Sequence, residues 1–269
     1  MAAVFGACAP NLIFHAAAHK HVPMMEHNQG EAIRNNVLGT RTVGEAALAA
    51  GVEHFVLIST DKAVNPTSVM GVTKRIAEFL AQELNGRGKT RFTVVRFGNV
   101  LGSNGSVVPL FTEQIRRGGP VMVTHPEIKR FFMTIPEAVQ LVLQASVLGR
   151  GGDVFVLDMG EQIHVADLAR NMIALSGQVA DQDIKITFTG LRPGEKLYEE
   201  LFDEGECIEP TAHAKINRAM SRIVFDEECL ARHVRELETL LDGSSPEKLM
   251  KKLQEVVSSY SQSMSDAGT

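Results

Sequence analysis

Residues 54–84 read HFVLISTDKAVNPTSVMGVTKRIAEFLAQEL, and this stretch decides the class of the fold. Its apolar opening, His54–Ser59, has the length of a buried strand, and Val69–Leu84 has the pattern of a helix. Asn65 and Pro66 force a turn between them. A strand followed by a turn and a helix is typical of a parallel α/β sheet.

The same alternation continues on both sides of this stretch. Further strands are expected at Leu12–His15, Arg91–Phe97, Val154–Leu157 and Ile184–Phe188. Further helices are expected at Glu31–Ala50, Pro136–Leu148, His164–Leu175, Asp226–Leu241 and Pro246–Tyr260. We therefore predict an α/β fold with a doubly wound, Rossmann-like parallel sheet and a smaller substrate-binding portion.

The expected organisation has four parts. Residues 1–108 would form a partial dinucleotide-binding domain, and residues 109–205 a substrate-binding portion interleaved with later sheet elements at about 136–175. Residues 206–260 are expected to be a C-terminal helical extension, and residues 261–269 a disordered polar tail.

The composition excludes several classes of protein. The chain has 269 residues and a net charge of -5, so it lacks the basic footprint of a nucleic-acid-binding protein. No apolar run reaches the ~20 residues that a membrane helix needs. The three cysteines, Cys8, Cys207 and Cys229, are far apart and odd in number, which argues against a disulfide framework and favours the cytoplasm.

The phosphate-binding turn of a dinucleotide-binding fold is missing. Such a fold opens with a strand, a G-x-G-x-x-G turn and a helix, and no G-x-G-x-x-G occurs in this sequence. The nearest candidate, GSNG at Gly102–Gly105, follows a later strand. We therefore expect the chain to begin partway through its sheet and to lack the first strands.

The residues that follow His54–Ser59 are the strongest candidates for chemistry. Thr60, Asp61 and Lys62 stand at the carboxyl end of a buried strand, where open α/β sheets bind their ligands. Met70 and Lys74, four residues apart, share one face of the next helix. This M-x-x-x-K occupies the place of the Y-x-x-x-K of short-chain dehydrogenases. The alternative is a surface turn whose Asp and Lys are merely solvated.

Several motifs in the same order resemble one family. They are HAAAHKHVPMME (15–26), NVLGT (36–40), STDKAVNPTSVMGVTKR (59–75), RFGNVLGSNGSV (96–107), RFFMTIPEA (130–138) and LRPGEKLYEEL (191–201). In this order they resemble the polysaccharide-biosynthesis dehydratases that convert UDP-N-acetylglucosamine to a 4-keto-6-deoxy sugar. Met70 in place of the tyrosine is similar to the large, membrane-associated, configuration-retaining branch, whose membrane helices and cofactor turn would lie before Met1.

The resemblance implies a catalytic role for each residue of the first motif. Asp61 would be the acid that protonates the leaving hydroxyl of carbon 6, and Lys62 the base at carbon 5, with Thr60 near the 4-hydroxyl. For Lys62 to act as a base its pKa must fall well below ~10.4, and Lys74 and a positive nicotinamide ring would lower it. Met70 cannot titrate, so the group that deprotonates the 4-hydroxyl stays open.

The resemblance also implies binding residues for a tightly held NAD or NADP and for a UDP-sugar. The expected cofactor-binding residues are His15, Ala16, Ala17, Asn36, Ser59, Lys74, Phe97, Gly98 and Val100. The expected substrate-binding residues are Lys20, Glu26, Asn99, Ser106, Arg130, Arg192 and Glu195. The histidines at 15, 19, 21 and 27 lack a carboxylate or cysteine at ligand spacing, so no metal site is expected.

Two rival interpretations remain. One is a nucleotide-sugar epimerase or reductase on the same scaffold, which residues 59–62 (STDK) disfavour, because an epimerase needs no additional acid or base. The other is a catalytically silent fragment that only associates with a partner, since the phosphate-cradling turn is missing. In either case we expect a homo-oligomer or association with a chain that supplies the missing half. The parent protein is expected at the cytoplasmic face of the inner membrane.

Overall fold

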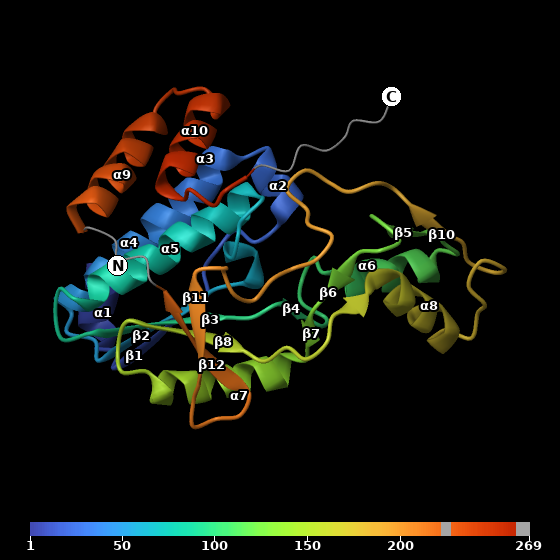
Figure 1. The fold of residues 1–269 in the computed structure, drawn as a ribbon, viewed down its shortest axis with the longest axis horizontal. Coiled ribbons are helices and arrows are strands. Elements are labelled where there is room, and N and C mark those ends of the chain that lie inside the picture. The colour runs from blue at the N-terminus through green and yellow to red at the C-terminus, as the bar shows by residue number, and fades with distance from the viewer. Residues whose placement is uncertain (222–226, 262–269) are drawn as a thin grey trace.

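A six-stranded sheet organises the protein, as seen in the computed structural model, which describes residues 1–221 and 227–261 (Figure 1). Its spatial order is β1-β2-β3-β8-β12-β11. The strands are β1 (Leu12–His15), β2 (His54–Ile58), β3 (Arg91–Arg96), β8 (Asp153–Leu157), β12 (Ile216–Ser221) and β11 (Glu206–Pro210). The first four run parallel. β12 then pairs antiparallel with β8, and β11 pairs antiparallel with β12. The predicted parallel α/β sheet is confirmed.

Helices cover both faces of this sheet (Figure 1). α4 (Gly39–Ala49) and α5 (Val69–Asn85) lie on one face, and α7 (Ile135–Leu148) lies on the other. α5 begins at Ser68, whose hydroxyl accepts a hydrogen bond from the backbone N–H of Gly71 at 3.0 Å, a typical N-cap. Because α5 is almost wholly buried, it fixes the turn between itself and β2 with little freedom.

The helix expected at Glu31–Ala50 is built from three consecutive pieces. These are α3 (Gln29–Ala32), a π-helical segment (Ile33–Leu38) and α4. π-type turns inside helices often occur at functional sites. Here the segment presents Asn36, whose side chain accepts from the N–H of His19 and donates to its carbonyl. The π-helical turn therefore holds the loop that follows β1. Two short helices flank this region: α1 (Ala2–Cys8), which contacts α4, and α2 (Val22–Glu26), which contacts α5.

The C-terminal part corrects one expectation. Residues 206–260 do not form a purely helical extension, because β11 and β12 form an antiparallel hairpin that pairs with β8. β12 covers the free hydrogen-bonding edge of β8, and this pairing favours a strand conformation for the hairpin. The two expected helices do follow, as α9 (Glu227–Leu240) and α10 (Pro246–Val256), packed on α3 and α5. Residue 226, the first of the expected helix Asp226–Leu241, and residues 262–269 of the expected tail lie outside the described residues.

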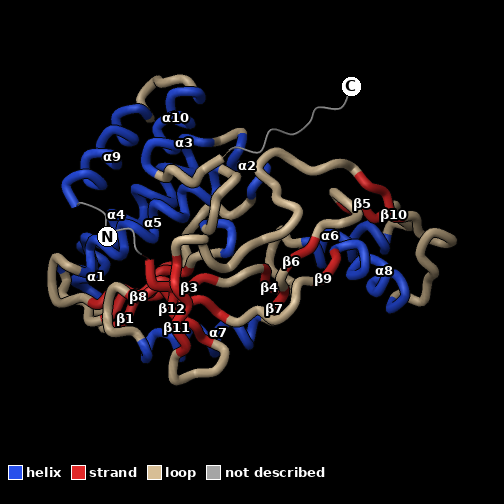
Figure 2. Tube along the Cα trace, in the orientation of Figure 1, coloured by secondary structure: helices blue, strands red, loops and turns tan. Residues whose placement is uncertain are grey.

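A smaller portion lies at one end of the large sheet (Figure 2). Its core is formed by α6 (Val107–Arg116), β5 (Val121–Val123), α8 (Val165–Leu175) and β10 (Ile186–Phe188). Two short ladders connect it to the sheet: β4 (Asn99–Val100) with β7 (Phe132–Met133), and β6 (Lys129–Arg130) with β9 (Ile163–His164). Within the range 136–175, α7 and β8 belong to the large sheet, as expected for later sheet elements. α8 belongs instead to the smaller portion, because it packs against α6 and β5.

One edge of the large sheet stays open. Among the described residues no strand pairs with the outer side of β1, and its side chains Leu12 and Phe14 are 41% and 40% exposed. No helix in the described ranges has the length and apolar character needed to cross a bilayer. Among the described helices and strands, β2, β3, α5 and the smaller portion position the candidate site.

Candidate active site

The end of β2 carries the catalytic candidates. Ser59 and Asp61 are tied to the neighbouring strand, because their backbone N–H groups donate to the carbonyls of Val95 at 2.7 Å and Phe97 at 3.1 Å. Thr60 then caps a 3₁₀ turn, Asp61–Ala63, that projects Lys62 away from the sheet. The strand end is thus a rigid platform, as expected for the ligand-binding edge of a parallel sheet.

Asp61 and Lys62 form a pair at this platform. The Lys62 ammonium donates to Asp61 Oδ1 at 3.0 Å, and the hydroxyl of Thr60 donates to the same oxygen at 3.0 Å. Asp61 is fully buried, and its Oδ2 has no hydrogen-bond partner among the described residues. A Cβ on Gly98 would lie 3.0 Å from this oxygen and 2.8 Å from Phe131 Cβ, so only glycine permits the close approach.

The ionisation of Lys62 differs from the expectation. Burial lowers the pKa of Lys62, but the carboxylates of Asp61 and Glu199 raise it by more, so that its pKa lies above the usual value. The Arg130 guanidinium lowers the pKa of Lys62, but not enough to reverse the shift. The expected lowering is therefore wrong for the unliganded protein, because two carboxylates outweigh the desolvation of one ammonium.

Met70 and Lys74 lie one turn apart on α5, with both side chains buried. Lys74 donates to the carbonyl of Ile58 at 2.7 Å, at the last residue of β2. Burial lowers its pKa to about 8, and Glu78 opposes the shift. Lys74 is therefore partly neutral near physiological pH, whereas Met70 only packs and lines the site.

Two cavities meet at Lys62. The first, which we call the strand-end cavity, has a volume of about 340 Å³ and lies over the carboxyl ends of the strands. Predicted residues that line it are Ala16, Lys20, Ser59, Thr60, Lys62, Met70, Lys74, Phe97, Gly98, Asn99, Val100 and Ser106. Lys20 bridges its rim by donating to the hydroxyl of Ser103 at 3.3 Å. Most of the predicted cofactor and catalytic residues thus gather around one space.

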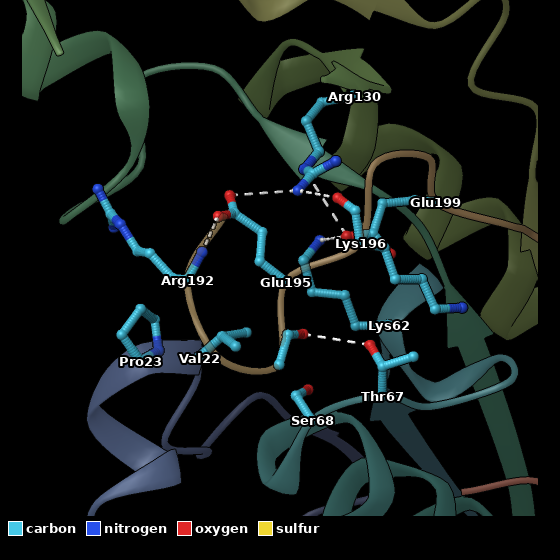
Figure 3. A pocket seen from close by; sticks show the side chains of 11 residues that line it. Val22, Pro23, Lys62, Thr67, Ser68, Arg130, Arg192, Glu195, Lys196 and Glu199 are labelled. Atoms are coloured by element: carbon cyan, nitrogen blue, oxygen red, sulfur yellow. Dashed lines mark hydrogen bonds and ion pairs between the residues drawn. The ribbon is translucent and has the colours of Figure 1, made fainter. Parts of the chain in front are cut away.

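The second cavity, which we call the arginine cavity, has a volume of about 100 Å³ (Figure 3). Lys62, Arg130, Arg192 and Glu195 line it, so it brings the remaining predicted charges together. Arg130 Nη2 lies 3.4 Å from Glu195 Oε1, and the backbone N–H of Arg192 donates to the other oxygen of Glu195 at 3.1 Å. Arginine side chains beside a polar cavity are suited to bind phosphate.

Four predicted binding residues line neither cavity. Ala17 is exposed in the loop after β1, and Asn36 is buried beneath that loop. Glu26 is buried and accepts a hydrogen bond from the N–H of Val69 at 2.7 Å, so it serves the first turn of α5. The structure gives the carboxylate of Glu26 this interior contact, away from both cavities.

His15, the fourth of these residues, is buried at the end of β1. Its Nε2 lies 3.1 Å from the hydroxyl of Thr40, and that hydroxyl donates its own proton to the carbonyl of Asn36 at 2.7 Å. Nε2 must therefore carry the ring proton, since only a donor can complete the pair. Burial, with help from Lys74, lowers the pKa of His15 to about 4. The ring is a neutral interior support for the loop.

One residue of the site was not singled out from the sequence. Glu199 is buried, lines the arginine cavity, and lies 3.5 Å from Lys62 Nζ through Oε1 (Figure 3). Its signal was a second carboxylate in the LRPGEKLYEEL motif. In the ranges that the structure covers, no group of three or more histidine, cysteine or carboxylate side chains is arranged to hold a metal ion.

The parallel sheet with its site at the strand ends defines a Rossmann-like protein of the extended short-chain dehydrogenase class. Among solved structures, Pen from Bacillus thuringiensis is 35% identical, with a TM-score of 0.73 over 84% of this chain and 75% of that one. MoeE5 in complex with UDP-glucuronic acid and NAD is 27% identical, with a TM-score of 0.58 over 68% of this chain and 67% of that one.

The family is shown by sequence. The model of the polysaccharide biosynthesis protein family matches residues 1–221, and the chain belongs to this family. It is 56% identical over 244 residues to the capsular polysaccharide biosynthesis protein CapD of Staphylococcus aureus. That match covers 90% of this chain and 40% of the relative, so the chain spans about two fifths of CapD.

Proposed function

We propose that this site belongs to a UDP-N-acetylglucosamine 4,6-dehydratase that uses NAD or NADP and makes a UDP-4-keto-6-deoxy sugar for a surface polysaccharide. The observation that carries the proposal is the Asp61–Lys62 pair: its lysine lines both the strand-end cavity and the arginine cavity, and Asp61 is buried behind it. A dehydratase needs one acid and one base facing the same sugar, and this pair supplies both types of group.

The strand-end cavity suits the nicotinamide end of the cofactor. Ala16 and Ala18 leave its wall without bulky side chains, and Gly98 allows the chain to pass close to Asp61. Lys74 offers an ammonium from beneath. A cofactor held by these residues would supply the hydride chemistry, which is acceptance of a hydride from carbon 4 of the sugar and its later return to carbon 6. Similarity to MoeE5, whose structure contains NAD and UDP-glucuronic acid, supports this use of the fold.

The arginine cavity suits the diphosphate and uridine of the substrate. The Arg130 guanidinium could bind phosphate oxygens from one wall, and Arg192 extends from the rim. Glu195 would accept hydrogen bonds from ribose hydroxyls. Asn99 and Ser106, on the wall of the other cavity, would contact the part of the substrate that extends there.

Asp61 and Lys62 would carry out the elimination. Oxidation at carbon 4 acidifies the hydrogen on carbon 5, so neutral Lys62 removes that proton while Asp61 protonates the hydroxyl that leaves carbon 6 as water. Lys62 then returns a proton to carbon 5. The proton of the 4-hydroxyl goes to a base that we leave unassigned, and the net change is loss of one water from the sugar.

The resting ion pair must first change its protonation. Lys62 is charged and Asp61 is its carboxylate partner, whereas the elimination needs neutral Lys62 and protonated Asp61. A single proton shift along the 3.0 Å hydrogen bond from Lys62 Nζ to Asp61 Oδ1 produces both.

The experiment is incubation of the enzyme with UDP-N-acetylglucosamine in deuterated water. Mass spectrometry is expected to show loss of water and incorporation of deuterium at carbon 5. Lys62→Ala should abolish the exchange while UDP binding stays nearly unchanged, since a general base acts mainly in the transition state. Lys248→Ala, at an exposed position on α10, is the control. Unchanged exchange in Lys62→Ala would overturn the assignment.

A further inference from the structure

Glu199 is buried between the two cavities with an incomplete set of partners. Its side chain is 3% exposed, and its Oε1 lies 3.5 Å from Lys62 Nζ and 3.7 Å from Arg130 Nε. The other oxygen, Oε2, is buried and has no hydrogen-bond partner among the described residues. A buried carboxylate that leaves an oxygen unpaired costs free energy, so its position calls for a physical reason.

Arg130 does not supply that reason. Its guanidinium already donates to the carbonyls of Lys129 at 2.7 Å and Lys196 at 2.9 Å, and more weakly to that of Leu197 at 3.3 Å. The Nε–Glu199 distance of 3.7 Å is beyond a hydrogen bond. The contact with Lys62, at 3.5 Å, is likewise an ion pair without a short hydrogen bond. Because three backbone carbonyls already accept from Arg130, the carboxylate acts more on Lys62.

We infer that Glu199 is a positioning residue for Lys62: it holds the ammonium at the boundary between the two cavities and keeps it protonated until substrate enters. Asp61 Oδ1 lies 3.0 Å from Nζ on the strand-end platform. Glu199 lies on the other side, in the wall of the arginine cavity (Figure 3). The role of Lys62 as a base rests on the proposed function, but the effect of Glu199 on its charge does not.

The electrostatics around Lys62 agree with this geometry. The groups that act most on it are Asp61 on its own turn, Glu199 on the loop after Gly194 and Arg130 on β6. The other charged or titratable residues that share a cavity wall with it are Arg192, Glu195 and Lys196 in the arginine cavity and Lys20, His21 and Lys74 in the strand-end cavity. Both carboxylates raise the pKa of Lys62, and Arg130 lowers it. Removing the charge of Glu199 therefore lowers the pKa of Lys62, and the neutral form becomes accessible at lower pH.

The test is the titration of Lys62 in the ligand-free chain labelled with [ε-¹³C]lysine, its signal assigned by its loss in Lys62→Arg. In Glu199→Gln the midpoint should fall by about one pH unit or more, as expected for loss of one nearby charge. Glu200→Gln, the exposed neighbour that pairs with Lys196, should leave it unchanged. An unchanged midpoint in a folded Glu199→Gln protein would overturn the inference.

A second variant and a second readout keep the test decisive. Glu199→Asp retains the charge but withdraws it, so a smaller downward shift is expected even if the glutamine variant does not fold. In the holoenzyme, the acidic limb of the pH–rate profile should move to lower pH in Glu199→Gln, whereas a purely structural loss would lower the rate without moving the limb. A shifted titration in a protein that does not dehydrate the sugar would instead contradict the proposed function alone.

Discussion

Arg96 and Glu78 meet in the interior through two parallel hydrogen bonds, from Nε to Oε1 at 2.9 Å and from Nη2 to Oε2 at 2.7 Å. Both side chains are fully buried. Glu78 also accepts a hydrogen bond from the hydroxyl of Ser59 at 2.6 Å, and Arg96 binds Glu206 of β11. The pair therefore connects β3, α5, the end of β2 and the antiparallel hairpin.

Breaking this pair should destabilise the protein strongly. Arg96→Met leaves the Glu78 carboxylate buried without its main partner, and the free energy of unfolding should fall by about 3–5 kcal/mol. The measurement is urea denaturation followed by circular dichroism. Arg116→Met removes an arginine that pairs with Glu113 on the surface, where such pairs contribute little to stability. Similar losses for the two variants would contradict this account.

The buried His15 predicts a pH dependence of stability. Its pKa is about 4 in the folded chain against 6.5 for an unperturbed histidine, so folding favours the neutral ring. This contribution is complete above pH 6.5 and is lost as the pH falls toward 4, at a total of about 3 kcal/mol. His15→Gln should remove that part of the slope in thermal denaturation between pH 7 and 4. The exposed His27→Gln should retain it, and a slope common to all three proteins would exclude His15 as the cause.

Gly71 lies much closer to a neighbouring backbone atom than Gly39, another helical glycine, does. A Cβ at Gly71 would lie 2.2 Å from the backbone oxygen of Lys62, whereas a Cβ at Gly39 would lie 3.6 Å from its nearest neighbour, the carbonyl oxygen of Arg34. Gly71→Ala should therefore displace the turn that carries Lys62, lowering stability by about 1–3 kcal/mol and reducing turnover. Gly39→Ala should be neutral or stabilising by up to about 1 kcal/mol, because alanine favours helix. Equal behaviour of the two variants in denaturation and rate assays would refute the contact.

Met70 is expected to act by packing alone. It is 3% exposed and belongs to the cluster between α5 and the C-terminal helices, although it also lines the strand-end cavity. Met70→Leu should retain turnover within about tenfold, or 1.4 kcal/mol, because the two side chains have similar volume. Met70→Tyr should restore no missing step. A larger loss in the leucine variant, measured on folded protein, would show a role beyond packing.

The central elements of the fold could be predicted because their patterns are local. The run from His54 to Ser59 and the long helix from Val69 are each dominated by apolar residues at the spacing of their own structure. β11 could not be predicted in this way, because Glu206–Pro210 is mostly exposed and becomes a strand through its pairing with β12. Its structure is decided by a tertiary contact, which local pattern does not contain.

The candidate site was predicted in part for the same reason. Thr60, Asp61 and Lys62 could be predicted because they stand at the end of a recognisable strand. The cavity residues of the loop after β3 could be predicted because they stand at the end of the next one. The charge state of Lys62 could not be predicted in full, because it depends on Asp61 and also on Glu199, a residue distant in the sequence that only the folded chain brings to 3.5 Å. The burial of His15 could not be predicted, because its ring packs under the helix that carries Thr40, 25 residues further along the chain.

The walls of the two cavities come from stretches that begin at Ala16 and end at Glu199. No short fragment of the chain could therefore retain a complete binding surface. Any compound bound there would stabilise the whole folded unit against unfolding. At one hundred times its dissociation constant, such a compound would add about 2.7 kcal/mol to the free energy of unfolding. Thermal melting with a panel of nucleotides would then read out occupancy of the site without any assay of turnover.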